Sequence, residues 1–315
     1  MSREPAKFFI AVLGPTASGK TALGLALAER LGGEIVNCDS TAVYRGLDIG
    51  TDKPPVAERR GIPHHLIDIA EPTETYTAAR FAADASRAVR EIDARGRVPI
   101  VVGGTGLYYR ALTRGLFPGP ARDEALRARL YTIAERRGPG RLHRWLTKVD
   151  PESAARIQPR DTQRMVRALE VYLLTGRPLT AHFDDTARPL PEFQAVPIAL
   201  APERALIAER VARRVGLQFA AGIVREIEAL LAAGVPRDAH AFSGLVYRQV
   251  LEMLAGTRDE AATRALIVQE NLRYAKRQLI WFRKEPNLKW IPATGERDDT
   301  RDAALAHVAA RAGHP

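Results

Sequence analysis

Residues 14–21 are the most constraining feature of the chain, a glycine loop that reads Gly-Pro-Thr-Ala-Ser-Gly-Lys-Thr. The loop matches the pattern G-x4-G-K-[ST] at each fixed position. The continuous apolar run Phe8–Leu13 precedes it, as a buried parallel strand would, and Leu23, Leu27 and Leu31 follow it at helical spacing. A glycine turn that arose by chance would lack this flanking strand and helix, so the sequence predicts a phosphate loop.

The predicted loop is suited to a polyphosphate. Its glycines let successive backbone N–H groups face inward, and the following helix adds its positive N-terminal end. Lys20 would supply charge to a terminal phosphate, and Thr21 would place its hydroxyl on Mg²⁺, which prefers oxygen ligands. The predicted phosphate-binding residues are Gly14, Thr16, Ala17, Ser18, Gly19, Lys20 and Thr21. The motif alone leaves two classes open: an ATP-binding kinase of nucleosides or metabolites, and a transferase whose leaving group is diphosphate.

Alternating strand and helix patterns predict an α/β fold around this loop. Glu34–Cys38 and Val98–Val102 are further apolar strand candidates, and Thr77–Arg95 is a helix candidate with one apolar stripe. Strands that alternate with helices in this way form a parallel sheet with helices on both faces.

The pattern changes after the Gly- and Pro-rich stretch Gly115–Pro120, which we interpret as a linker. Helices without a convincing strand follow, at Asp123–Arg136, Arg141–Lys148 and Asp161–Leu174, the last capped by Asp161 and ended by Gly176. The sheet pattern then resumes with elements expected at Ala195–Leu200, Arg204–Ala232, Glu260–Arg283, Asn287–Ile291 and Ala303–Ala312. We therefore expect a P-loop α/β catalytic core at 1–115 and 191–315, with a parallel sheet flanked by helices, and an all-helical insertion domain at 116–190.

Charge and composition narrow the possible partners. The net charge of +10 favours an anionic partner such as nucleic acid, although Arg and Ala enrichment is also what a GC-rich genome would produce. The single cysteine, Cys38, excludes an intramolecular disulfide and a cysteine-based zinc cluster. No run of about 18 apolar residues is present, and Met1–Lys7 lacks the apolar stretch of a secretory signal. We expect a cytoplasmic protein without a membrane partner.

Asp39 follows the second predicted strand, at the sheet edge where open α/β sheets bind ligands. A carboxylate there can hold Mg²⁺ or accept a proton from an incoming nucleophile. The alternative is that Asp39 only caps a helix, a common role for aspartate after a strand.

The stretch from Asp39 to Pro54 resembles the D-S-x-x-V-Y-R-G-L-D-I-G-T-x-K-P signature of tRNA dimethylallyltransferases. The resemblance continues in ordered blocks over most of the chain, from about residue 10 to 290, at 61–68, 99–109, 161–172, 247–249 and 275–283. It implies transfer of a dimethylallyl group from dimethylallyl diphosphate to N6 of adenosine 37, next to the anticodon of tRNAs that read codons starting with U. The implied cofactor is Mg²⁺, the implied partner is the tRNA anticodon stem-loop, and we expect a monomer.

The resemblance also implies roles for individual residues. Asp39 matches the family's base, Thr105 would orient the target base or the diphosphate, and an arginine on the long helix would reach the diphosphate. Arg214 is the best match for that arginine, with Arg210 as its competitor. The expected tRNA-binding residues are Asp39, Ser40, Thr41, Ala42, Thr105, Arg127, Gln163, Arg164, Met165, Val166, Arg167, Tyr247 and Arg248. This chain departs from the family in having Thr41-Ala42 in place of Met-Gln, which removes a natural adenine reader, and Val246 in place of Gly.

Three alternatives remain beside this interpretation. An enzyme that prenylates free adenine nucleotides is disfavoured by the helical insertion with Arg164 and Arg167, because a small nucleotide needs no such surface. A P-loop kinase would transfer phosphate from ATP. An RNA-binding module with a vestigial loop would not depend on Lys20.

Overall fold

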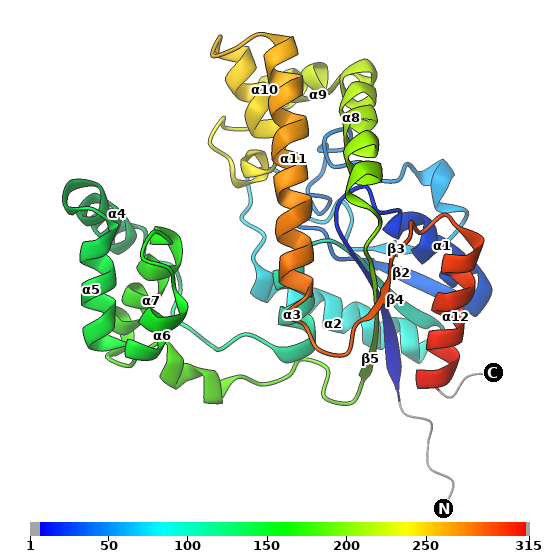
Figure 1. Ribbon diagram of the computed structural model, residues 1–315, viewed down its shortest axis with the longest axis horizontal. Coiled ribbons are helices and arrows are strands. Elements are labelled where there is room, and N and C mark those ends of the chain that lie inside the picture. The colour runs from blue at the N-terminus through cyan, green and yellow to red at the C-terminus, as the bar shows by residue number, and fades with distance from the viewer. Residues whose placement is uncertain (1–6, 313–315) are drawn as a thin grey trace, which may run out of the picture. The chain divides into compact units, whose positions relative to one another are not determined.

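The computed structural model describes residues 7–312 and divides them into two compact units. The first unit contains residues up to Thr113 and again from Pro189, and the second is Arg114–Arg188, the segment assigned above to an insertion. Figure 1 shows the elements of both units. The ends of the predicted core and most of the stretch Met1–Lys7, judged above to lack a secretory signal, lie outside the described residues.

The first unit is built on a six-stranded sheet in the order β3-β2-β4-β1-β5-β6, with every pair parallel. The strands are β1 (Phe8–Leu13), β2 (Gly33–Asn37), β3 (His64–His65), β4 (Val98–Gly103), β5 (Gln194–Leu200) and β6 (Lys289–Ile291). Ile10 of β1 lies opposite Ile100 of β4 and Val196 of β5. The predicted parallel α/β fold is confirmed, and the three strands are apolar along their length because both faces of the sheet are covered.

Helices cover each face of the sheet with a separate hydrophobic cluster. Ile10 and Val12 belong to the cluster shared with α1 (Lys20–Leu31) and α12 (Asp298–Ala312). Phe9, Ala11 and Leu13 belong to the opposite cluster, shared with α2 (Ala78–Ala94) and α3 (Gly106–Arg114). Because β1, β2 and β4 pair in parallel, their carboxyl ends lie at one edge of the sheet, where the loops that carry the site begin.

The remaining helices of the first unit are α8 (Arg204–Ala221), α9 (Ile223–Ala232), α10 (Tyr247–Leu254) and α11 (Glu260–Phe282), with short 3-10 turns at Val56–Arg59 and His240–Ser243. The expectation of one continuous helix over Arg204–Ala232 is wrong. Gly222 adopts φ of 98° and ends α8, its N–H bonded to the carbonyl of Phe219. The shortened helix α8 packs along α11, and the two lie side by side in Figure 1.

The second unit consists of α4 (Glu124–Arg137), α5 (Pro139–Val149), α6 (Pro151–Arg156) and α7 (Thr162–Thr175), followed by a 3-10 turn at Thr180–Asp185. Leu130, Leu142 and Leu169 lie in its buried core. Asp161 caps α7 by accepting from the N–H of Arg164, and Gly176 ends the helix in the left-handed region, as predicted. The short helix α6 was not predicted, because the sequence signal is only Asp150 as cap and proline at the first position.

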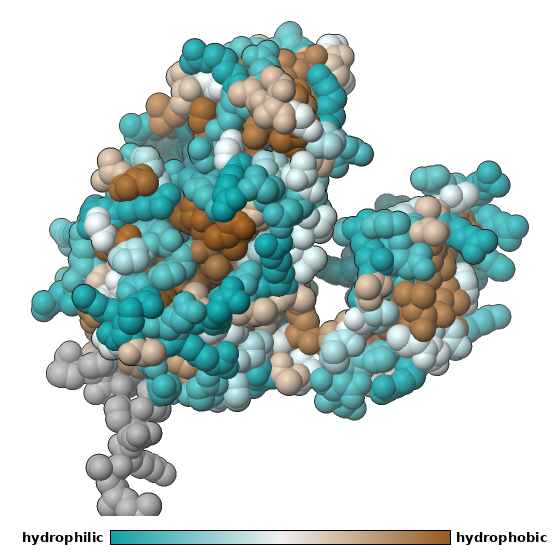
Figure 2. Space-filling model, turned by 180° about the vertical axis from the view of Figure 1, so that it is seen from behind, coloured by the Kyte–Doolittle hydropathy of each residue, from teal (hydrophilic) through white to brown (hydrophobic). Residues whose placement is uncertain are grey.

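The surface is largely hydrophilic in the view of Figure 2, with apolar side chains gathered in separate patches. No helix within residues 7–312 is long and apolar enough to cross a membrane.

Candidate active site

The glycine loop takes the expected phosphate-cradle form between β1 and α1. Gly19 precedes the helix at φ of 83°, a left-handed conformation that favours glycine. Lys20 donates from Nζ to the carbonyl of Pro15 at 2.7 Å, so its ammonium lies back over the loop. Burial, with the positive charge of Arg214 as a second cause, lowers the pKa of Lys20 to about 8. The lysine is therefore still charged at neutral pH. The nearby negative charge does not fully offset the effects that lower its pKa.

Gln278 of α11 ties the phosphate loop to the neighbouring strand. Its Oε1 accepts from the N–H of Thr16 at 2.9 Å, and its Nε2 donates to the carbonyl of Gly104 at 2.9 Å. The sequence placed Gln278 in a matching block but gave it no role, since nothing in the block shows that α11 reaches the loop.

Asp39 lies at the carboxyl end of β2 and is held in one orientation by Thr41. Oδ1 accepts from the N–H of Thr41 at 2.9 Å and from its hydroxyl at 2.7 Å. Within residues 7–312 Oδ2 has no hydrogen-bond or ion-pair partner. Asp39 caps a turn and no helix begins there, so the helix-cap alternative is wrong. Thr105 lies beside it and accepts from the N–H of Ser40 at 3.1 Å, while Tyr274 of α11 bonds the Thr105 side chain.

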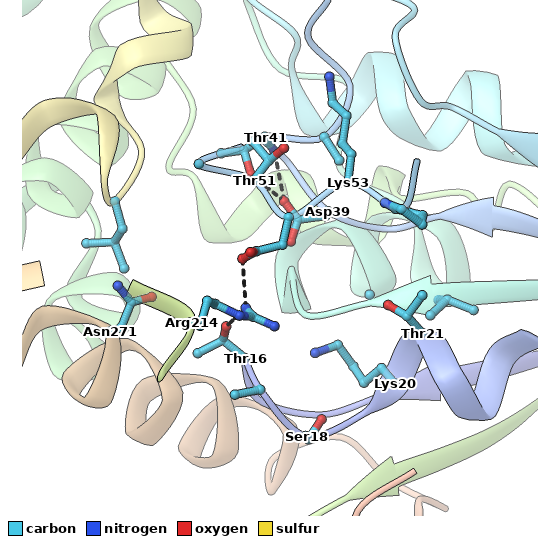
Figure 3. Close-up of a pocket in the computed structure, with 18 of the residues that line it drawn as sticks. Thr16, Ser18, Lys20, Thr21, Asp39, Thr41, Thr51, Lys53, Arg214 and Asn271 are labelled. Carbon is cyan, nitrogen blue, oxygen red and sulfur yellow. Dashed lines mark hydrogen bonds and ion pairs between the residues drawn. The ribbon is translucent and has the colours of Figure 1, made fainter. Parts of the chain in front are cut away.

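Both candidate arginines of α8 reach the phosphate loop, in different ways. Arg214 donates from Nη1 to the hydroxyl of Thr16 at 2.8 Å and forms an ion pair with Asp52 at 3.1 Å. Arg210 donates to the carbonyl of Ala17 at 3.0 Å and pairs with Glu296 at 2.6 Å. In Figure 3 Arg214 and Lys20 extend toward the same space from opposite sides. Arg214 is therefore better placed than Arg210 for an anion in the loop.

These side chains line one cavity of about 1190 Å³ in the first unit. Its walls come from the phosphate loop, the 39–54 segment, α8 and α11, and Thr21, Asp39, Ala42 and Arg214 all line it. Lys53 anchors the 39–54 segment, because its ammonium is bonded to Asp68 at 2.6 Å and to the carbonyl of Tyr44. The cavity is large enough for a diphosphate donor and a purine base together, and Lys20, Arg210 and Arg214 are among the charged side chains that line it.

The structure overturns four of the expected tRNA contacts because their side chains are buried. Met165 and Val166 lie in the core of the second unit, both 0% exposed. Arg127 is 8% exposed and pairs with Glu170 at 3.1 Å. Tyr247 is also 0% exposed and donates its hydroxyl to a carboxylate of α9 at 2.7 Å. For Met165 and Val166 the sequence did hold a signal, because the 3.6-residue period of α7 distinguishes the positions that face the core from those that face solvent.

The other expected contacts keep surface that a ligand can reach. Arg164 has a side chain 75% exposed, and Gln163 beside it is exposed as well. Arg248 is 51% exposed and lines the cavity. Arg167 already has partners within the protein, since it pairs with Glu170 at 2.8 Å and donates to the carbonyl of Pro120. Ser40 and Thr41 line the cavity itself, and Ala42 lines it too although it is only 6% exposed.

Val246 occupies a backbone conformation that valine rarely adopts, with φ of 77° and ψ of −61°. These angles define a strained γ-turn, and the β-branched side chain adds to the strain. The turn begins α10, where the N–H of Val246 donates to Gln249 at 2.8 Å. The glycine that relatives were expected to have here would adopt these angles without strain.

Comparison with known proteins places this geometry in a family. The sequence model described as IPP transferase matches residues 42–285. The chain belongs to the IPP transferase family. A tRNA dimethylallyltransferase of Koribacter versatilis is 48% identical over 300 residues, covering 93% of this chain and 94% of the relative.

Solved structures of IPP transferases agree with this assignment. The full-length tRNA isopentenylpyrophosphate transferase of Bacillus halodurans is 36% identical, with a TM-score of 0.71, and the match covers 97% of this chain and 96% of that one. A eukaryotic dimethylallyltransferase acting on tRNA is 27% identical, with a TM-score of 0.76, over 96% of this chain and 78% of that one.

The cavity fits a magnesium ion held mainly through a substrate. Thr21 and Asp39 offer a hydroxyl and a carboxylate to the same space. Within residues 7–312 no cluster of three or more His, Cys, Asp or Glu side chains could hold a metal by itself. Mg²⁺ is commonly bound by one or two protein oxygens together with substrate phosphates, so the hydroxyl of Thr21 suffices and the carboxylate of Asp39 is left for another role.

Proposed function

We propose that this chain transfers a dimethylallyl group from dimethylallyl diphosphate to N6 of adenosine 37 in tRNAs that read codons starting with U, and releases diphosphate. The observation that carries the proposal is the single cavity in which the phosphate loop, Arg214 and the open oxygen of Asp39 meet. A kinase would use the same loop, but the chain's membership of the IPP transferase family favours diphosphate as the leaving group.

Departure of diphosphate is the step that the loop stabilises. Negative charge grows on the leaving group as the allylic carbon–oxygen bond breaks, and preorganised donors stabilise that charge more in the transition state than in the ground state. Lys20, the N–H groups of the loop and Arg214 are such donors. Thr21 would hold Mg²⁺, which supplies further positive charge to the diphosphate oxygens.

Asp39 accepts the proton that the adenine amino group loses as N6 bonds to carbon. Its Oδ1 is fixed by two hydrogen bonds from Thr41, which leaves Oδ2 to take the proton. Thr105 is bonded to Ser40 and Tyr274, which line the cavity, and we propose that it helps to orient the target base through them.

The acceptor is proposed to be the anticodon stem-loop of a tRNA. The target adenine must leave its stack before N6 can reach a buried carbon. Arg164 and Gln163, both exposed on α7, are proposed phosphate contacts on the stem, and Arg248 a contact at the cavity mouth. The net charge of +10 supports such a partner. We further propose that the protein works as a monomer in the cytoplasm.

The proposal is tested by incubating the protein with dimethylallyl diphosphate, Mg²⁺ and synthetic anticodon stem-loops, followed by mass analysis of the digested RNA. We expect N6-isopentenyladenosine only at position 37 of loops that read U-initial codons. A stem-loop with guanosine at that position is the matched control. Preferential modification of free AMP over the stem-loop would favour the nucleotide-prenylating alternative.

A further inference from the structure

Asp52 is a second carboxylate of the cavity, and the expected site did not include it. The family signature leaves its position open, in the x of G-T-x-K-P. Its Oδ2 forms an ion pair with Nη1 of Arg214 at 3.1 Å and accepts a hydrogen bond from Nε2 of Gln218 at 3.1 Å. Arg214 donates from the same Nη1 to Thr16. Asp52 therefore holds the guanidinium that lies over the phosphate loop.

Gln218 fixes the side of Asp52 that is turned toward α8. This glutamine is 3% exposed, and its Nε2 donates to the carbonyls of Ile49 and Gly50, each at 3.3 Å, as well as to Asp52. All three partners are acceptors, so the amide cannot turn around without leaving them unpaired. The carboxylate of Asp52 is consequently held by two elements, the 39–54 segment and α8.

Neighbouring groups act on the pKa of the Asp52 carboxyl in opposite directions. The side chain is 32% exposed, and the net effect of its surroundings raises its pKa to about 6. Loss of hydration in the cavity is the largest cause, and the negative charge of Asp39 is a smaller cause in the same direction. Arg214, the cation that faces it, and the hydrogen bond from Gln218 both lower it. At pH 7 the group is mostly ionised, and its ionisation depends on the pairing with Arg214.

We propose that Asp52 holds Arg214 over the empty phosphate loop as an anion, and takes up a proton from solvent when a diphosphate engages that guanidinium. The inference rests on the proposed binding of diphosphate in the loop. A diphosphate brings negative charge close to Asp52 and competes for its cation. Both changes disfavour the ionised carboxylate, so donor binding and protonation are linked. The linkage makes Asp52 a positioning residue for Arg214, and product release returns the proton to solvent.

The test is calorimetric titration with inorganic diphosphate and Mg²⁺ at pH 7, in two buffers of different ionisation enthalpy. The difference between the two heats gives the protons taken up on binding. Asp52→Asn is the matched variant, since asparagine accommodates the φ of 51° at this position. Asp52→Gly also tolerates this φ, and it removes the carboxylate should the first variant fail to fold.

At pH 7 the carboxyl of Asp52 is about 10% protonated before diphosphate binds, and we expect it to be mostly protonated afterwards. The unmodified protein should therefore take up about half a proton or more in excess of the uptake measured for either variant. The protonation of diphosphate itself is common to all three proteins and cancels. Equal uptake with retained diphosphate binding would overturn the role of Asp52 and leave the proposed function standing. Absence of diphosphate binding in all three proteins would overturn both.

Discussion

Binding of the diphosphate donor should weaken steeply above pH 8, because Lys20 loses its charge there. Burial lowers the pKa of this lysine to about 8, and the nearby cation Arg214 lowers it too. Below that pH the ammonium is present and attracts the diphosphate. As the pH rises through 8 the empty site loses this charge, whereas a bound diphosphate would restore the pKa of the lysine to a higher value.

The size of the effect follows from the lowered pKa. If the bound state keeps Lys20 protonated, the apparent dissociation constant rises about tenfold per pH unit above 8, which is about 1.4 kcal/mol per unit. At pH 9 the affinity should be about elevenfold weaker than at low pH. The limit is reached once the lysine of the bound state also titrates, near its ordinary pKa of about 10.4.

The assay is equilibrium binding of inorganic diphosphate with Mg²⁺ between pH 7 and 9.5. Lys20→Arg is the matched control, since arginine keeps its charge over this range and the ligand's own titration is the same for both proteins. We expect the difference in slope between the two proteins to approach one log unit per pH unit. Parallel curves for the two proteins would refute the assignment of Lys20 as a diphosphate ligand.

Further predictions concern Asp39, the second unit and Val246. Asp39→Asn should retain tRNA binding and lose at least ~10²-fold in single-turnover rate; a loss of tRNA binding instead would make Asp39 structural. Arg164→Ala should lower the slope of log affinity for tRNA against log salt by about one without changing stability. Arg127→Ala should instead cost roughly 1–3 kcal/mol in urea unfolding, since the buried Glu170 loses one cation but keeps its ion pair with Arg167. An unchanged salt slope in Arg164→Ala together with an unchanged stability in Arg127→Ala would contradict the separate roles given to the exposed and the buried arginine. Val246→Gly should be more stable than Val246→Ala, the reverse of the usual order, because glycine relieves about 1–3 kcal/mol of strain; the usual order in a melting experiment would contradict the strain.

The sequence predicted the parallel sheet and the phosphate loop because these features depend on local patterns. The apolar run Phe8–Leu13 and the glycines that follow it are informative without knowledge of the rest of the fold. Asp39 and Thr105 were also predictable, since residues that follow parallel strands meet at one sheet edge. Arg214 needed the resemblance to a family, because helical spacing alone does not say which arginine of α8 faces the loop.

The sequence failed where tertiary packing decides. Arg127 and Tyr247 carry polar groups that suggest a surface role, yet both are buried with partners distant in the chain. Gln278 and Asp52 contribute to the site through contacts more than 150 residues away along the chain, which no local pattern encodes. The strain at Val246 became visible only with its backbone angles, although the departure from the family's glycine was a signal.

The central claim is that the phosphate loop holds a leaving diphosphate and not a phosphoryl donor. It is tested most directly by measuring, in one reaction with unmodified tRNA, the diphosphate released, the N6-isopentenyladenosine formed and any phosphate transferred from labelled ATP. The account predicts one diphosphate per modified adenosine, no transferred label, and loss of both products in Lys20→Ala. Label transferred from ATP, or modification that persists in Lys20→Ala, would contradict it.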